Sequence, residues 1–153
     1  AKMSAEITQN HPEGIKGAQA VAAAIFLARG GESKQQIRSW AEETFSYDLT
    51  MTPNDIRPGY AFDVTCQGSV PQALVCFLHS MDVEDAIRTA VSIGGDSDTI
   101  ACISGSIAEA FYGRVPQDLA HWCLSKLDQS QRQVVKRFCH EVMGLAESSA
   151  LPS

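Results

Sequence analysis

A short acidic segment holds the residues best suited to chemistry. The sequence GGDSDT, residues 94–99, places two carboxylates two positions apart, at Asp96 and Asp98, and a hydroxyl at Thr99. Hard divalent cations such as Mg²⁺ and Mn²⁺ prefer oxygen ligands of this kind, and paired glycines allow a sharp turn and the close approach of a ligand. Aspartate and threonine are also common helix N-caps, so a purely structural interpretation stays open at this point.

Two familiar aspartate motifs do not match this segment. An EF-hand loop counted from Asp96 needs an oxygen ligand at its fifth position and glycine at its sixth, where the chain has Ile100 and Ala101. The phosphatase signature D-x-D-x-T/V also fails at Ile100, and a helical pattern precedes the segment in place of a buried strand. The residue pattern alone therefore leaves a helix cap and a metal site as the two interpretations.

Length, composition and charge predict an acidic protein with a hydrophobic core. The 153 residues are 44% hydrophobic and 20% charged, with a formal net charge of -6, and we expect one domain over residues 1–153. Acidic surfaces disfavour a nucleic-acid partner, because phosphates need neutralising cations. The five cysteines are odd in number and form no CxxC pair, which favours reduced thiols in a cytoplasmic protein. No apolar run is long enough to favour a membrane partner.

Helical patterns recur along the chain and strand patterns do not, which predicts an all-α fold, a compact multi-helix bundle. Residues 14–29 are apolar nearly all round, so we expect this helix to be central and buried. Capping patterns and apolar stripes predict further helices over residues 33–45, from Thr52-Pro53, from Pro71, from Asp82, over 99–112 and over 130–143. The longest irregular stretch is expected over residues 47–68.

Two further features concern helix packing and the start of the chain. Small residues lie on one face of the 99–112 helix, at Ala101, Ser104, Gly105 and Ala108, where they would let another helix approach closely. Residues 1–7 have the pattern of the middle of a helix, without a cap or turn before them. We therefore expect a truncation, a proteolytic fragment or a split gene.

Three segments closely resemble the ADP-ribosylglycohydrolases, a family that includes the dinitrogenase reductase-activating glycohydrolases. They are residues 7–29, residues 68–78 and SIGGDSDTIACISGSIAEAFYG, residues 92–113. They occur in the family's order and correspond to the carboxy-terminal part of its helical domain, with the amino-terminal part missing. The resemblance implies a hydrolase that binds two divalent ions, Mg²⁺ or Mn²⁺. It would cleave the N- or O-glycosidic bond joining ADP-ribose to a protein side chain or a related acceptor.

The same resemblance implies Asp96, Asp98 and Thr99 as metal ligands. The family's other ligands come from an earlier glycine-rich acidic segment and a Thr-Asp-Asp motif, which do not occur here. The catalytic residue of this chain is therefore unknown, and the general base is expected in the missing part. Three protein oxygens cannot hold two ions that each take about six ligands, so we expect the isolated chain to be inactive.

Candidate substrate-binding residues are Gln9, His11, Gly68, Ser69 and Gly95. Many relatives carry a T-H-x-H-P pattern whose first histidine helps to hold ADP-ribose, and this chain has Gln9 at that place. Local turn structure is the competing interpretation for Gln9 and His11. For Ser69, which precedes the helix expected from Pro71, helix capping competes equally.

Alternatives to an enzyme are a non-catalytic ADP-ribose-binding module and a structural, crystallin-like protein. The intact trio of candidate ligands argues against a structural role, which would not need it. The resemblance implies an ADP-ribosylated protein or a small ADP-ribose conjugate as the partner of the active site. A helix bundle that lacks one part exposes apolar faces, so we also expect the missing amino-terminal half, or a second copy of this chain, as a partner.

Overall fold

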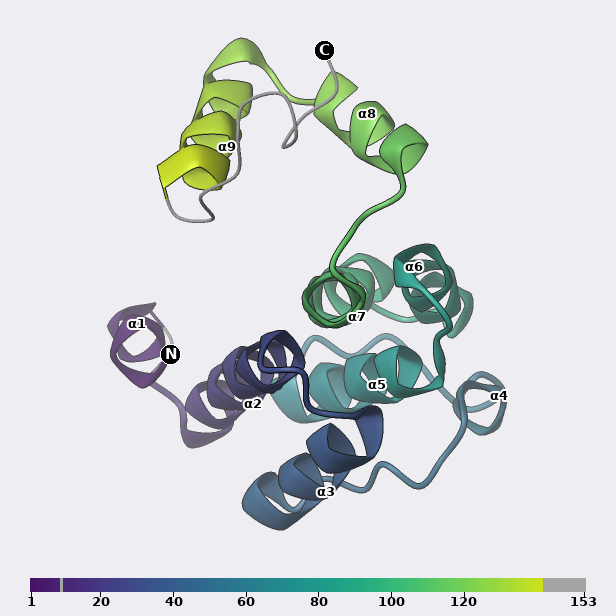
Figure 1. Ribbon diagram of the computed structural model, residues 1–153. Coiled ribbons are helices and arrows are strands. Elements are labelled where there is room, and N and C mark those ends of the chain that lie inside the picture. The colour runs from purple at the N-terminus through teal and green to yellow at the C-terminus, as the bar shows by residue number, and fades with distance from the viewer. Residues whose placement is uncertain (9, 142–153) are drawn as a thin grey trace. The chain divides into compact units, whose positions relative to one another are not determined.

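Every regular element in residues 1–8 and 10–141, the residues that this computed structural model describes, is a helix (Figure 1). The helices are α1 (Lys2–Thr8), α2 (Pro12–Arg29), α3 (Lys34–Phe45), α4 (Pro53–Ile56), α5 (Cys66–His79), α6 (Val83–Ser92), α7 (Ser97–Tyr112), α8 (Gln117–Ser125) and α9 (Gln129–Glu141). The predicted all-α class is confirmed. The described residues fall into two units, one over residues 1–114 and one that begins at residue 115, and a single domain over the whole chain stays a prediction.

Helices α2, α5 and α7 form the centre of the first unit, where each contacts the other two. Helix α6 packs on α5 and α7, α3 and α1 pack on α2, and α4 packs on α5 (Figure 1). Large side chains from α3, α5 and α7 are completely buried, including Ile37, Leu74, Phe77, Ile100 and Ile107. Burial of such side chains contributes roughly 1.5–3 kcal/mol each, so α7 is fixed firmly on its inward side.

The small residues of α7 allow the close approach that the sequence predicts, and the partner is α6. Ser104, Gly105 and Ala108 are buried, and the Ser104 hydroxyl donates a hydrogen bond to the Ala86 carbonyl at 3.4 Å. A Cβ atom on Gly105 would lie 3.0 Å from the Ile87 side chain. Any larger residue at Gly105 would therefore push α6 and α7 apart.

Helix α2 differs from the prediction that it is buried all round. Its buried residues are Gly17, Ala20, Ala24 and Ala28, spaced three or four apart on one stripe, whereas Phe26 is 77% exposed. The four buried residues are small, so neighbouring helices approach the α2 backbone closely there. An apolar composition on every side gives no information about which side the neighbours choose, and the all-round prediction is wrong for this reason.

Helix α5 begins at Cys66, not at Pro71 as the sequence suggested. Thr65 is its N-cap and accepts a hydrogen bond from the Gly68 amide at 3.1 Å. Pro71 lies inside the helix, in its second turn, where the missing N–H forfeits one helix hydrogen bond. Ser69 is therefore a helical residue and not an N-cap. The irregular stretch expected over residues 47–68 is shorter than predicted, since α4 interrupts it and it ends at Thr65.

The predicted helix caps of α3, α4 and α6 are confirmed. Ser33 and Thr52 each form a reciprocal capping box, and Asp82 accepts a hydrogen bond from the Asp85 amide at 2.8 Å. Helix α7 ends at Gly113, whose φ of 79° suits glycine. Within the described residues, no helix is long and apolar enough to cross a membrane.

The second unit contains α8, which the sequence did not predict, and α9. None of the residues of these two helices is buried in the structure. The Arg132 side chain donates hydrogen bonds to the carbonyls of Leu127 and Ser125, which ties the start of α9 to the end of α8. The predicted final helix is confirmed as far as Glu141, and the rest of it lies outside the described residues.

Candidate metal centre

The turn before α7 leaves the side chain of Asp96 unused by the helix. Gly94 and Gly95 have φ values of 82° and 66°, which glycine adopts without strain. Asp96 follows as the N-cap residue, and its side chain makes no capping hydrogen bond. The capping interpretation that the sequence left open therefore does not describe Asp96.

Asp98 and Thr99 lie in the first turn of α7, where both are exposed, and Asp96 is half-buried. The helix macrodipole favours negative charge at this end of a helix. Hydrogen bonding with the neighbouring Asp96 carboxyl, and then with the backbone amides of Thr99 and Asp98, holds the pKa of Asp98 below its ordinary value of 3.8. Asp98 is therefore ionised at neutral pH, and its charge lies close to a second carboxyl group.

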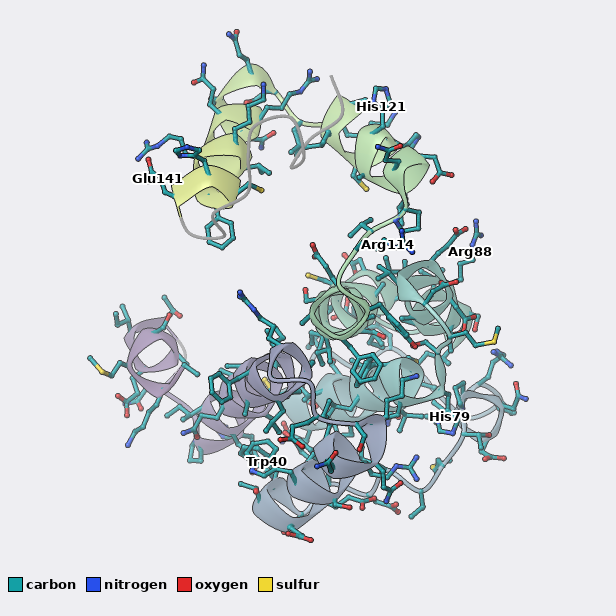
Figure 2. The ribbon with its side chains drawn as sticks, viewed as in Figure 1. Trp40, His79, Arg88, Arg114, His121 and Glu141 are labelled. Carbon is teal, nitrogen blue, oxygen red and sulfur yellow. The ribbon has the colours of Figure 1, made fainter. Side chains whose placement is uncertain are left out.

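No ion pair of the described residues neutralises these two carboxylates. The ion pairs that the structure contains are Lys2–Glu6, Lys16–Glu13, Arg88–Glu84 and Arg137–Glu141, each within one helix. The labelled Arg88 projects from the outer side of α6, where it pairs with Glu84 at 2.7 Å (Figure 2).

The donor set fits a hard divalent cation in its chemistry but is too small to enclose one. Two carboxylates and a hydroxyl are the oxygen ligands that Mg²⁺ and Mn²⁺ favour. Across the described part of the chain, no three His, Cys, Asp or Glu side chains gather into a possible metal site. With about six ligands needed per ion, water or another polypeptide would have to complete the coordination of any ion bound here.

Tyr60 lies beside the motif, and sequence reasoning missed it. Its hydroxyl donates a hydrogen bond to the Gly68 carbonyl at 2.9 Å. A Cβ atom on Gly95 would lie 2.8 Å from Cδ1 of the Tyr60 ring, so the ring packs directly against the glycine. Burial first, and then the negative charges of Asp63 and Asp96, raise the pKa of Tyr60. A lone tyrosine in an irregular stretch gave no signal of this position.

Three of the five candidate substrate-binding residues come together around Tyr60. Gly68 accepts its hydrogen bond, Gly95 touches its ring, and Ser69 is the next residue after Gly68. Ser69 is buried, and its hydroxyl donates to the Asp63 carbonyl at 3.2 Å. These contacts bring Gly68 and Ser69 beside the motif to which Gly95 belongs, and the contact of the three residues with a substrate stays a prediction.

The other two candidates lie at the start of α2. His11 is the N-cap of this helix, and its ring nitrogen Nδ1 accepts a hydrogen bond from the Glu13 amide at 3.2 Å. The local turn role that competed with ligand binding is therefore present at His11. Gln9 lies outside the described residues. Substrate binding by either residue stays a prediction.

Arg57 holds the end of α6 that leads into the motif, and sequence reasoning missed this residue as well. Its side chain donates to the Ser92 carbonyl at 3.1 Å and to the Ser92 hydroxyl at 2.8 Å. A third hydrogen bond reaches the side chain of Asn54 at 2.6 Å. These hydrogen bonds hold Ser92, the last residue of α6, two residues before the GGDSDT turn begins.

A sequence profile of the ADP-ribosylglycohydrolases matches residues 1–151. The chain belongs to the ADP-ribosylglycohydrolase family. The human protein named ADP-ribosylhydrolase ARH3 is 26% identical in a 170-residue alignment that spans 80% of this chain and 47% of the human protein. The ARH3 of Bos taurus is 28% identical with the same coverage of both chains. The ARH3 of Mus musculus is 41% identical over 68 residues, 36% of this chain and 18% of the mouse protein.

This ADP-ribosylglycohydrolase chain spans about half the length of the human and bovine relatives, 47% in each case. No solved structure matches it. The family profile matches nearly the whole chain, whereas the alignments with these relatives span about half of each relative.

Proposed function

We propose that this chain supplies part of the metal centre of an enzyme that hydrolyses ADP-ribosyl linkages. The observation that carries the proposal is the state of Asp96, whose side chain makes no capping hydrogen bond at a helix start where such bonds are usual. Asp98 and Thr99 stand exposed in the adjoining turn. The helix therefore makes no use of the Asp96 carboxyl, and Asp98 and Thr99 lie next to it, at the place where the family resemblance implies ligands.

In this proposal Asp96, Asp98 and Thr99 hold Mg²⁺ or Mn²⁺, one or both of two ions in the complete enzyme. Such an ion, when bound, polarises oxygen atoms of its ligand and orients a water molecule. The work of this chain is to fix the carboxylates and hydroxyl around a ribose, while the general base comes from residues outside it. The substrate is an ADP-ribosylated protein or a small ADP-ribose conjugate, in line with the names of the relatives.

Metal binding is tested by titrating the chain with Mn²⁺ and following free Mn²⁺ by electron paramagnetic resonance. We expect weak binding, because water must fill most coordination positions, and a loss of at least about tenfold in Asp96→Asn and Asp98→Asn. Asp48→Asn is the matched control, since Asp48 is also exposed but is hydrogen-bonded to Thr50. Equal affinities in all four proteins would overturn the metal site.

Activity is tested by the release of free ADP-ribose from an ADP-ribosylated protein in the presence of Mn²⁺. We expect release by a protein that joins this chain to the amino-terminal half of the family domain, and none by the chain alone. Absence of release by the joined protein, with the substrate intact, would refute the proposed hydrolase. Serine-linked and arginine-linked substrates, used side by side, distinguish O- from N-glycosidic specificity.

A second candidate function is binding of ADP-ribose without turnover. The small donor set favours it for the isolated chain, since two carboxylates and a hydroxyl can hold a ligand-bridged ion but provide no general base. Calorimetry with ADP-ribose and Mn²⁺ together tests this function. Turnover by the chain alone would contradict it.

We also propose that the chain associates with a second polypeptide, either the complementary half of the domain or another copy of itself. Met3 and Ile7 of α1 and Phe26 of α2 are each more than three-quarters exposed, at 84%, 83% and 77%. Exposed apolar side chains in such numbers are typical of protein interfaces. A soluble 16.5 kDa monomer in sedimentation equilibrium would contradict self-association.

All five cysteines are free, which supports a reducing, cytoplasmic setting.

A further inference from the structure

Tyr60 connects the start of α5 to the turn that carries the proposed metal ligands. Its backbone amide donates to the Ile56 carbonyl at 3.1 Å, and its hydroxyl donates to the Gly68 carbonyl at 2.9 Å. Between these two fixed points the aromatic ring lies against Gly95. The residue is half-buried, and both its backbone amide and its hydroxyl donate hydrogen bonds within the protein.

The segment that holds Tyr60 is itself tied together by hydrogen bonds. The Asp63 side chain accepts from the Thr65 amide at 2.7 Å, and the Asp63 carbonyl accepts from the Ser69 hydroxyl at 3.2 Å. The Gly68 amide donates to the Thr65 hydroxyl at 3.1 Å. A carboxylate oxygen of Asp63 lies 2.9 Å from the place that a Cβ atom on Gly68 would take. The Tyr60 hydroxyl is therefore anchored on a well-defined piece of backbone.

Gly95 is exposed, but the Tyr60 ring leaves no room for a side chain on the face of Gly95 that it covers. A Cβ atom there would lie 2.8 Å from the ring atom Cδ1, closer still to Cε1, and 3.0 Å from the Ala61 carbonyl oxygen. Distances below 3.0 Å are ones that real Cβ atoms essentially never show. The ring thus determines how far the turn can move towards α5. Gly95 is bonded directly to Asp96, so a displacement of Gly95 also displaces the backbone of Asp96.

We propose that Tyr60 is a positioning residue for Asp96. The ring holds Gly95 in place by contact, and the hydrogen bond to Gly68 holds the ring. In this role Tyr60 acts through the turn and touches neither ion nor substrate. The inference rests on the proposed function for its purpose, but its main test is made without metal.

The main test is the backbone order parameter of Gly95 and Asp96, from ¹⁵N relaxation of the metal-free chain. We expect about 0.85 in the unmodified chain, as in rigid backbone, and a fall to below about 0.6 in Tyr60→Leu, which removes the ring contact and the hydroxyl. Tyr60→Phe keeps the ring and should give an intermediate value. Tyr112→Phe is the matched control, because it removes a tyrosine hydroxyl bond at the other end of α7.

The contact can also be disturbed from its other side. Gly95→Ala introduces the clash with the ring, together with a strained φ, and should lower the order parameter of Asp96 even if Tyr60→Leu fails to fold. Unchanged order parameters at Asp96 in a folded Tyr60→Leu or a folded Gly95→Ala protein would overturn the inference.

A double-mutant cycle on Mn²⁺ affinity separates positioning from general loss of structure. We expect Gly95→Ala to weaken Mn²⁺ binding about 10- to 100-fold when Tyr60 is present. In the Tyr60→Leu background the same substitution should have an effect at least about tenfold smaller, because the strained φ is common to both and only the clash is gone. Equal effects in the two backgrounds would overturn the coupling. If the unmodified chain binds no Mn²⁺, the metal site fails, and the order parameters alone decide the role of Tyr60.

Discussion

The charged side chains at the two ends of α7 differ in whether they have partners within the described protein. At its start, Asp96 and Asp98 stand close together and pair with no cation from the described residues. At its end, the half-buried Lys34 ammonium donates to the Ser80 carbonyl. The ammonium also lies 5.4 to 5.7 Å from three ring centroids, those of Phe77, Phe111 and Tyr112.

The difference separates a charge that stabilises the fold from charges that are free to bind. Lys34 is the first residue of α3, where the helix dipole disfavours a cation, yet its ammonium reaches the carbonyl of the residue that caps the end of α5. Carbonyls at helix ends lack helical partners, so this hydrogen bond supplies one. The charge at the end of α7 is satisfied within the protein, and the charges at its start are not.

Lys34→Met gives the largest expected change in stability. Methionine keeps the apolar stem but removes the hydrogen bond and the cation–π contacts, so the free energy of unfolding should fall by about 2–3 kcal/mol. Urea denaturation measures the change, and Lys2→Met, an exposed lysine paired only with Glu6, is the control. Mn²⁺ affinity should stay the same. A fall below about 0.5 kcal/mol would mean that the Lys34 charge does not stabilise the fold, and the contrast between the two ends of α7 would fail.

The next expected effect is a loss of stability of the first unit at alkaline pH. Burial raises the pKa of Cys76, in the last turn of α5, from 9.0 to about 12. Because the folded value is raised, this contribution is fully present below pH 9.0 and is lost as pH rises towards about 12, by up to about 1.4 kcal/mol per pH unit. The pKa of Tyr47 is raised from 10.0 to about 12, mainly by burial, so its own loss begins only above pH 10.0.

The measurement is urea denaturation at several pH values between 8 and 11. Cys76→Ala should flatten the slope between pH 9.0 and pH 10.0, the interval that belongs to the thiol alone, although it lowers stability at neutral pH by leaving a cavity. The same slope in Cys76→Ala and in the unmodified chain would show that another group titrates.

Tyr112→Phe, at the same end of α7 as the Lys34 ammonium, should have a smaller effect on stability. Its hydroxyl donates to the Ser80 carbonyl at 2.6 Å and lies 3.2 Å from the Ser80 hydroxyl. Loss of one such hydrogen bond should lower the free energy of unfolding by about 1 kcal/mol. The change is measured by thermal and urea denaturation. An unchanged stability would mean that Lys34 alone satisfies the carbonyl.

Asp96→Asn should change stability least of all, because its side chain makes no capping hydrogen bond. We expect the free energy of unfolding to stay within about 0.5 kcal/mol of the unmodified chain, while Mn²⁺ binding is lost as described above. Urea denaturation without metal measures the free energy of unfolding. A loss of 2 kcal/mol or more, on the order of a lost helix cap, would make Asp96 a structural residue and end the contrast between the two ends.

Much of the fold followed from local rules that act within one helix. The capping box at Ser33, the cap at Thr52 and the glycine after α7 were readable because a cap needs only a few neighbouring residues. The start of α5 was not, since a proline at position 71 outweighed a threonine at position 65 in the sequence pattern. The buried stripe of α2 was also hidden, because a helix that is apolar on all sides does not say which side its neighbours take.

The candidate ligands were readable for a similar reason, since Asp96, Asp98 and Thr99 lie together in the sequence. Tyr60 was not readable, because its position depends on a contact between an irregular segment and a turn far along the chain. Arg57 is a second case, as its hydrogen bonds to Ser92 join the end of one helix to the end of another. Residues that position a site from a distance have no local pattern to announce them.

The ion pairs of the described residues have a consequence for ionic strength. Each of them closes within a single helix, so the packing between helices relies on apolar contacts, hydrogen bonds and the contacts of the half-buried Lys34 ammonium with aromatic rings. Added salt screens exposed charges, with a Debye length of about 8 Å at physiological concentration, but it scarcely weakens such packing. A strong dependence of ligand binding on sodium chloride could then be assigned to the carboxylates at the start of α7, without a loosened helix assembly as its cause.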